Sequence, residues 1–305
     1  MTQDKASKTF NLLSEKLIKE HWDFYPTAGS RIGHHQYDGR LPDLSPAQNA
    51  RRVLELKSGQ KELQRINSKD LSDAERMSSQ MLDLFLQREL FVFNDLKPLE
   101  NNPMRHIGYL NVSGYIHRNY APLEDRLRAA SRTMRQVPDF LNVLDKALAK
   151  QLSSYLVEMS IESYSGMAGF YRKDLAGATN GITDFEVIKE FNQAREAAAS
   201  ALENFVVQLK DRGNSGPEGF SIGPKLYARM LATGEGLDAP LSHIAAIGQT
   251  NLDENLSRIK EIAQSIAPGR AITDIVEEVG RNHPQPHTLI SETQNMLEDI
   301  RQALT

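Results

Sequence analysis

The chain has 305 residues, enough to bury a sizeable hydrophobic core in one large domain or two modest ones. Its 36 Lys and Arg against 40 Asp and Glu give a net charge of −4 without any basic block, which argues against nucleic acid or an anionic membrane surface as the main partner. The absence of cysteine excludes disulfides, a thiolate nucleophile and a cysteine-based zinc site.

The chain opens on Met-Thr-Gln-Asp-Lys, which lacks the apolar region of a secretory signal. No stretch approaches the ~20 apolar residues of a membrane span. The sequence as written therefore predicts a cytoplasmic protein without a membrane span. If a leader has been removed, the protein would instead be periplasmic or a lipoprotein.

Helical periodicity dominates, and β-branched or aromatic residues nowhere alternate over four to eight positions as they do in a strand. We therefore predict an all-α fold, an elongated array of about nine or ten helices without a substantial sheet. No internal repeat divides the chain. We expect a single helical region over residues 1–305.

In the first part of the chain, helix starts alternate with irregular segments. Gly, His and Asp predict a loop over 26–44, and Ser45-Pro46 is an N-cap before a first-turn proline. Ser72 with Glu75 has the spacing of a capping box. Residues 100–120, rich in aromatic side chains and His, are expected to form an irregular connector.

The middle of the chain carries the longest apolar face. Residues at three- and four-residue steps predict one long helix through 141–159. Thr183 and Glu186 have capping-box spacing and predict a helix start. Four glycines predict a flexible loop over 212–224. The face of the long helix is formed by Leu141, Leu144, Leu148, Leu152, Tyr155 and Met159.

Two further helices are expected in the last part, over 252–266 and 289–304, with a proline-rich loop at 280–286 between them. The apolar stripe of the last helix reaches Leu304 without a glycine cap or a following proline. We expect either that this helix frays or that the natural chain continues.

Histidine spacing gives no metal motif. His-Glu-x-x-His is absent, and no Glu lies three residues before a His. His283 and His287 have the spacing of two ligands on one helical face, but Pro284 and Pro286 prevent a helix there. They are expected to be exposed loop histidines.

The densest polar cluster runs from Gly33 to Asp43 and allows two interpretations. In one, His35 and Asp38 are metal ligands or an acid–base pair. In the other, the segment is a turn in which Asp38-Gly39 and Pro42-Asp43 cap neighbouring helices while His35 and Tyr37 pack beneath.

Aromatic and His side chains gather again in the connector, where Tyr109, Tyr115 and His117 are found together with His106, Arg118 and Tyr120. They either line a ligand pocket or form a buried connector whose Tyr hydroxyls find local partners.

Four segments, in order, resemble the bacterial domain-of-unknown-function family 885. The first, EHWDFYPTAGSRIGHHQYDGRLPDLSP, carries Gly33, His35, Tyr37, Asp38, Leu41, Asp43 and Ser45. The second, YAPLEDRLRAASRTMRQVPDFLNVLDKAL, carries Val137-Pro138. The third, GPKLYARMLATGEGLDAPLSHIAAIGQTNLDENLSRIKEIAQSI, carries Gly223, Tyr227, Leu231 and Gly248, and the fourth, NHPQPHTLISETQNMLEDI, carries His283, Pro284 and Leu289.

The resemblance implies a helical, zinc-dependent hydrolase of the peptidase type. The family's zinc motif, of the His-Glu-x-x-Pro-Gly-His-His type, lies in a C-terminal half that this sequence lacks. No catalytic, cofactor-binding or metal residue is therefore carried over, and zinc is expected only with that missing half. His287 also departs from the family, where Thr, Asp or Glu is usual.

We therefore expect the non-catalytic N-terminal half of a family-885 hydrolase, inactive alone, which supplies scaffold and part of a substrate cleft. Its partners would be the missing C-terminal half or another helical chain and, in the full-length form, a peptide substrate. The alternative is a stand-alone helical binding or scaffold protein. A third hypothesis is a complete enzyme acting through His35 and Asp38. The candidate cleft or structural residues are His35, Tyr37, Asp38, Asp43, Tyr109, Tyr115 and His117.

Overall fold

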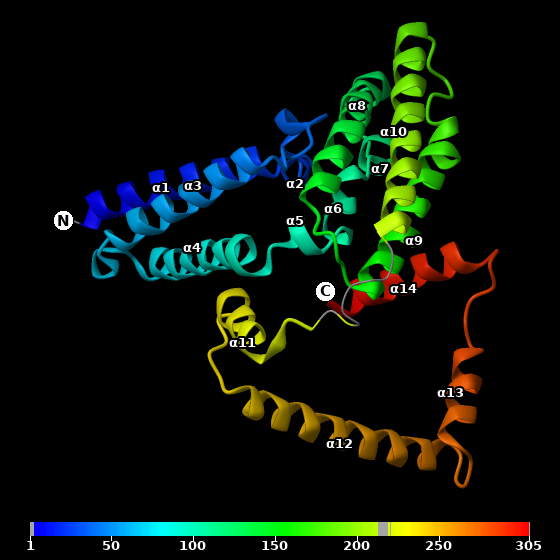
Figure 1. The fold of residues 1–305 in the computed structure, drawn as a ribbon. Coiled ribbons are helices and arrows are strands. Elements are labelled where there is room, and N and C mark those ends of the chain that lie inside the picture. Colours follow the sequence, from blue (N-terminus) through cyan, green and yellow to red (C-terminus); the bar gives the residue numbers. More distant parts are fainter. Residues whose placement is uncertain (1–2, 213–218, 220, 305) are drawn as a thin grey trace. The chain divides into compact units, whose positions relative to one another are not determined.

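The computed structural model describes residues 3–212, 219 and 221–304. All regular structure in these residues is helical and none is strand, which confirms the all-α prediction (Figure 1). By its contacts the chain divides into two compact units, Met1–Asp238 and Ala239–Thr305, which are described separately. The expected single helical region over 1–305 stays a prediction.

The first unit begins with three long helices that pack against one another, α1 (Gln3–Phe24), α3 (Pro46–Gln64) and α4 (Asp73–Phe91). They share a core that includes Phe10, Leu13, Leu56 and Leu86. A Cβ atom at Gly59 of α3 would lie 2.4 Å from Leu17 Cδ2, so glycine allows the close approach of α1 and α3. The 3₁₀ turn η2 (Ser68–Asp70) joins α3 to α4.

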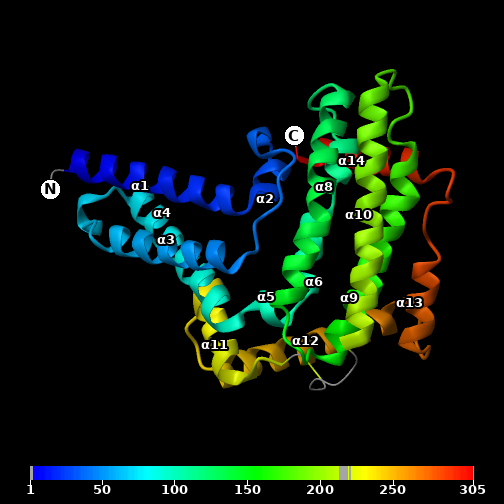
Figure 2. The same ribbon diagram turned by 45° about the horizontal axis from the view of Figure 1, so that its top comes forward.

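A second group of helices forms the larger core of this unit. α8 (Leu123–Ala147), α9 (Ser154–Arg172) and α10 (Phe185–Arg212) run alongside one another, with η5 (Asp174–Gly177) between α9 and α10 (Figure 2). Their shared core includes Leu127, Met134, Leu144, Phe191 and Phe205, all nearly inaccessible to solvent. α11 (Gly223–Gly234) packs on α4.

Short helical segments connect these groups. The predicted loop 26–44 contains α2 (Pro26–Arg31) and the 3₁₀ turn η1 (His35–Tyr37). A π-helical turn, η3 (Val92–Leu96), follows α4. The predicted connector 100–120 contains the end of α5 (Pro98–Asn101), then α6 (Met104–Ile107), η4 (Gly108–Leu110) and α7 (Ser113–His117). The predicted nine or ten helices correspond to the longer helices of the described residues, and these short segments come in addition to them.

All three predicted helix starts are confirmed, two of them with the predicted capping residue. Ser45 Oγ accepts the N–H of Gln48 at the start of α3, and Ser72 with Glu75 forms a capping box at the start of α4. The Thr183/Glu186 box is wrong. Asp184 caps α10 in place of Thr183, because its Oδ1 accepts the N–H of Glu186 at 2.9 Å. Arg128 donates to the other oxygen of the same carboxylate and holds it in position.

The single helix predicted through 141–159 is also wrong, because α8 ends at Ala147 and α9 begins at Ser154. Long-range contacts stabilise the break. Arg212 donates to the carbonyl oxygens of Asp145 (2.5 Å) and Ala149 (3.0 Å), and the Ala149 N–H donates to Glu100 O (2.7 Å). These bonds satisfy backbone groups that a continuous helix would have paired internally.

The second unit contains α12 (Leu241–Ile266), α13 (Ile272–Gly280) and α14 (Leu289–Leu304), which confirms the helices predicted over 252–266 and 289–304. His283 and His287 are exposed and lie between α13 and α14, as predicted. Most of the predicted loop 212–224, namely residues 213–218 and 220, lies outside the described residues. None of the described helices is long and apolar enough to span a bilayer.

Candidate functional site

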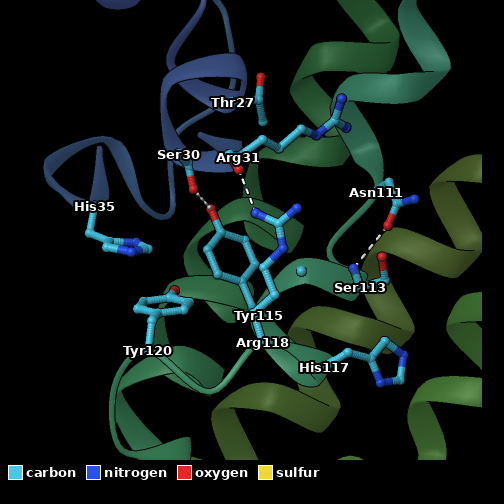
Figure 3. Close-up of a pocket in the computed structure, with 11 residues that line it drawn as sticks. Thr27, Ser30, Arg31, His35, Asn111, Ser113, Tyr115, His117, Arg118 and Tyr120 are labelled. Carbon is cyan, nitrogen blue, oxygen red and sulfur yellow. Dashed lines mark hydrogen bonds between the residues drawn. The ribbon is translucent and has the colours of Figure 1, made fainter. Parts of the chain in front are cut away.

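Two segments distant in sequence meet at a pocket of about 230 Å³ in the first unit. One segment comprises α2 and η1, and the other comprises α7 and its flanking residues (Figure 3). The sequence analysis singled out η1 and the segment around α7 as candidates, but not α2. The lining residues are Thr27, Ser30, Arg31, His35, Asn111, Ser113, Gly114, Tyr115, His117, Arg118 and Tyr120.

Asp38, whose side chain is 11% exposed, joins the two segments from behind the pocket wall. Its Oδ1 accepts the Ser30 hydroxyl at 2.5 Å, and its Oδ2 accepts the Tyr120 hydroxyl at 2.7 Å. His35 Nδ1 lies 3.2 Å from the same Oδ2, and the His35 ring stacks on Tyr120 with centroids 3.7 Å apart. The carboxylate therefore fixes the positions of three side chains of this wall.

Tyr120 remains a hydrogen-bond donor at neutral pH. Burial raises the pKa of its hydroxyl, and the bond to the Asp38 carboxylate raises it further. Because the phenol stays protonated, the contact between α2–η1 and the connector is a charge-assisted hydrogen bond.

Tyr115 fixes α7 against the turn that follows η1. Its hydroxyl accepts the Gly39 N–H at 3.0 Å and lies 3.4 Å from Ser30 Oγ. Gly39 has φ of 81°, and a Cβ there would lie 2.6 Å from Arg132 Nε, so the turn requires glycine. The buried Arg126 donates to Tyr115 O at 2.8 Å and holds the end of α7 from below.

The described residues that line the pocket include two arginines and two histidines but neither Asp nor Glu. Arg31 donates to Gly108 O, and Arg118 Nη1 donates to Arg31 O at 2.5 Å. A guanidinium has five N–H donors, and each of these contacts uses one. The pocket therefore offers donors in a positively charged environment, which suits a carboxylate or another oxyanion.

The structure brings together only some of the predicted residues. His35, Tyr115 and His117 line the pocket, with Asp38 behind it. The turn interpretation holds for Tyr37, which is buried and donates to Asp23 Oδ1 at 3.1 Å. It does not hold for His35, which is 42% exposed because its ring lies on the face of Tyr120 and not beneath the turn.

The other two candidates lie elsewhere. Asp43 Oδ1 accepts the Ser45 N–H at 2.8 Å and lines a separate charged pocket. The turn interpretation expected Asp43 to cap a neighbouring helix, but the residue that caps α3 is Ser45. Tyr109 lines another pocket, of about 560 Å³. Sequence reasoning missed Ser30, Arg31 and Asn111. Pro26 as a first-turn residue of α2 was the available signal for the first two, because it places them at the C-terminal end of that helix.

The His35 and Asp38 pair does not fit a zinc site. Both Asp38 oxygens already accept hydroxyl hydrogen bonds, and the pair provides two of the at least three protein ligands that zinc requires. Within the described residues, no three His, Asp or Glu side chains gather in a way that could hold a metal ion.

Comparisons with known proteins add a family and a fold. A family model described as "Bacterial protein of unknown function (DUF885)" matches residues 26–305. A solved structure, described as "a putative lipoprotein of unknown function from Shewanella oneidensis", matches with a TM-score of 0.72 and 20% identity over 97% of this chain and 57% of that chain. The chain thus spans little more than half of that protein's length. No curated protein matches the sequence.

Proposed function

Since the chain belongs to the bacterial family of unknown function DUF885, we propose that it is the non-catalytic helical part of a zinc-dependent hydrolase of the peptidase type. Its pocket would form part of the substrate cleft wall. The family is the one predicted from four sequence segments. The hydrolase class rests on the resemblance of that family to zinc-dependent hydrolases. The zinc ion and its ligands would come from a part of the protein outside this sequence.

The observation that carries the proposal is the convergence of α2–η1 and α7 on one positively charged pocket. A peptide substrate offers a terminal carboxylate, and Arg31 and Arg118 can donate N–H groups to it. The hydrogen bonds of Asp38 and Tyr115 hold the wall in place before substrate binds, which reduces the entropy lost on binding. These residues bind and orient the substrate, and no step of hydrolysis is assigned to them.

Apolar faces in the second unit support a helical partner. α12 and α14 each present large side chains that are about half exposed or more, and extended apolar patches typically mark interaction surfaces. We propose that the remaining part of the family's fold covers them, which co-purification with that part would test. The exposed apolar side chains include Leu252, Leu256, Ile259, Ile262 and Ile266 on α12, and Leu289, Met296, Leu297 and Ile300 on α14.

Calorimetric titration with N-acetyl-dialanine and its C-terminal amide tests the pocket. We expect the free acid to bind about tenfold more tightly, because hydrogen bonds to charged groups contribute roughly 1.5–3 kcal/mol. Arg118→Gln should remove the preference, whereas the exposed Arg281→Gln in the second unit should retain it. Equal affinity for acid and amide would contradict the proposed role of the pocket.

The location of the protein stays a proposal. The Shewanella oneidensis protein is described as a lipoprotein, and that description applies to that protein. For this chain we keep the cytoplasmic prediction beside the periplasmic or lipoprotein alternative. Cell fractionation of the source bacterium would decide between them.

A further inference from the structure

A second pocket, of about 560 Å³, lies in the first unit where α1 and α4 meet the connector. It is separate from the Arg31/Arg118 pocket and shares no lining residue with it. Its wall is largely apolar, with contributions from Phe24, Leu99 and the ring of Tyr109. A cavity of this volume accommodates a small organic molecule.

Polar atoms without partners are concentrated on this wall. His106 is only 5% exposed, and its ring nitrogens have no well-formed hydrogen bond, although the ring approaches the backbone of Pro98. His21 Nδ1 and Glu89 Oε2 are also buried and unpartnered, and the Glu89 carboxyl group lies beside the Tyr25 hydroxyl. Buried polar atoms are almost always paired, so several such atoms on one cavity wall favour a ligand that carries polar groups of its own.

The two histidines of this wall are uncharged. Burial lowers the pKa of both His21 and His106 to about 4, so both imidazoles are neutral at neutral pH. Burial raises the pKa of Glu89, while the Arg52 guanidinium and the Tyr25 hydroxyl lower it. The remaining charged lining residues, Lys97, Glu100 and Arg105, are exposed and of both signs.

We propose that this pocket binds an uncharged molecule with an apolar body and a carboxamide group. The amide N–H would donate to Glu89 Oε2, and the amide carbonyl would accept the N–H of His106. A neutral imidazole carries one donor and one acceptor nitrogen, so it can pair with such a group without a change of charge. The apolar body would lie against Phe24 and the other apolar side chains of the wall.

The test uses three probes of similar shape on the intact chain: benzamide, toluene and benzoate. Binding is followed through the NMR signals of the His21 and His106 rings. We expect saturable shifts with benzamide and about tenfold weaker binding of the other two, because a polar site rejects analogues that leave its groups unpaired. Equal binding of toluene, or no saturable binding of benzamide, would overturn the proposal.

Two variants locate the site. Glu89→Leu removes the acceptor and should weaken benzamide at least about tenfold, whereas Glu89→Gln keeps an acceptor oxygen and should retain binding. His243→Phe, at an exposed histidine of the second unit, is the control. Benzamide binding that survives Glu89→Leu in the folded protein would contradict the assignment. If that variant does not fold, the comparison of the three probes on the unmodified chain decides. Arg118→Gln should leave benzamide binding unchanged, so this test fails or succeeds independently of the cleft-wall proposal.

Discussion

Asp38 accepts hydroxyl hydrogen bonds from Ser30 on α2 and Tyr120 beyond α7, two segments far apart in sequence. Residue chemistry alone singled out the His35/Asp38 pair but left two interpretations open. The residue that decides between the two interpretations is Tyr120, which lies 82 positions from Asp38, and no local sequence pattern predicts that hydrogen bond. The turn interpretation correctly expected Tyr37 to be buried, although the hydrogen-bond partner of Tyr37, Asp23, lies 14 positions away.

Asp38→Ala should lower the free energy of unfolding by about 1–3 kcal/mol, because it leaves the Tyr120 hydroxyl without its acceptor. Denaturant unfolding measures the change. Asp211→Ala, at an exposed carboxylate near the end of α10, should change stability little. A loss as small in Asp38→Ala as in the control would refute the proposed role of Asp38.

Buried neutral histidines should make stability depend on pH. His106 has a pKa of about 4 in the folded protein against an ordinary 6.5, so the unfolded chain binds its proton first as the pH falls. The contribution of neutral His106 to the free energy of unfolding is complete above pH ~6.5. It is lost as the pH falls towards 4, and the loss reaches about 3 kcal/mol. Glu89, with a raised pKa, acts in the opposite direction.

The measurement is therefore a difference between two proteins. Unfolding free energies between pH 4 and 7 should fall less steeply towards low pH in His106→Phe than in the unmodified chain. Identical slopes would show that His106 is not buried in its neutral form.

At the scale of the elements, the long helices and two of the three caps could be predicted, whereas α2 inside the predicted loop 26–44 and the break after Ala147 could not. The Ser72 capping box depends on residues three positions apart and was found. The break after Ala147 depends on Arg212 and Glu100, which lie far from it in sequence. The apolar face continues across the break because Leu148 and Leu152 are buried in the same core as Leu144, although they are no longer helical.

Arg212→Ala should therefore loosen the junction between α8 and α9. The side chain donates to three carbonyl oxygens there, those of Asp145, Leu148 and Ala149, and pairs with the Asp145 carboxylate at 2.7 Å. Its removal should cost about 1–3 kcal/mol. Hydrogen exchange of the amides at 145–153 should accelerate. Lys210→Ala, two residues earlier and exposed, is the matched control, and equal exchange in the two variants would rule out this cause of the break.

At the scale of the whole molecule, the all-α class followed from periodicity, because a helical face repeats within the sequence itself. The pocket did not follow, because it requires α2–η1 and α7 to meet in space. The polar and aromatic composition of the sequence singled out the polar segment 33–43, which contains η1, and the connector 100–120, which contains α7, but not α2. It gave no means of separating Tyr109, which lines the other pocket, from Tyr115.

The central claim is that this chain is the non-catalytic part of a zinc-dependent hydrolase, and the zinc content of the purified 305-residue chain tests it most directly. After dialysis against trace zinc, elemental analysis should find less than about a tenth of an equivalent, because the described residues contain no cluster of three metal-binding side chains. A site with three protein ligands would normally retain its ion. One retained equivalent would contradict the account. Its loss in His35→Ala or in His283→Ala would then show which segment holds the metal.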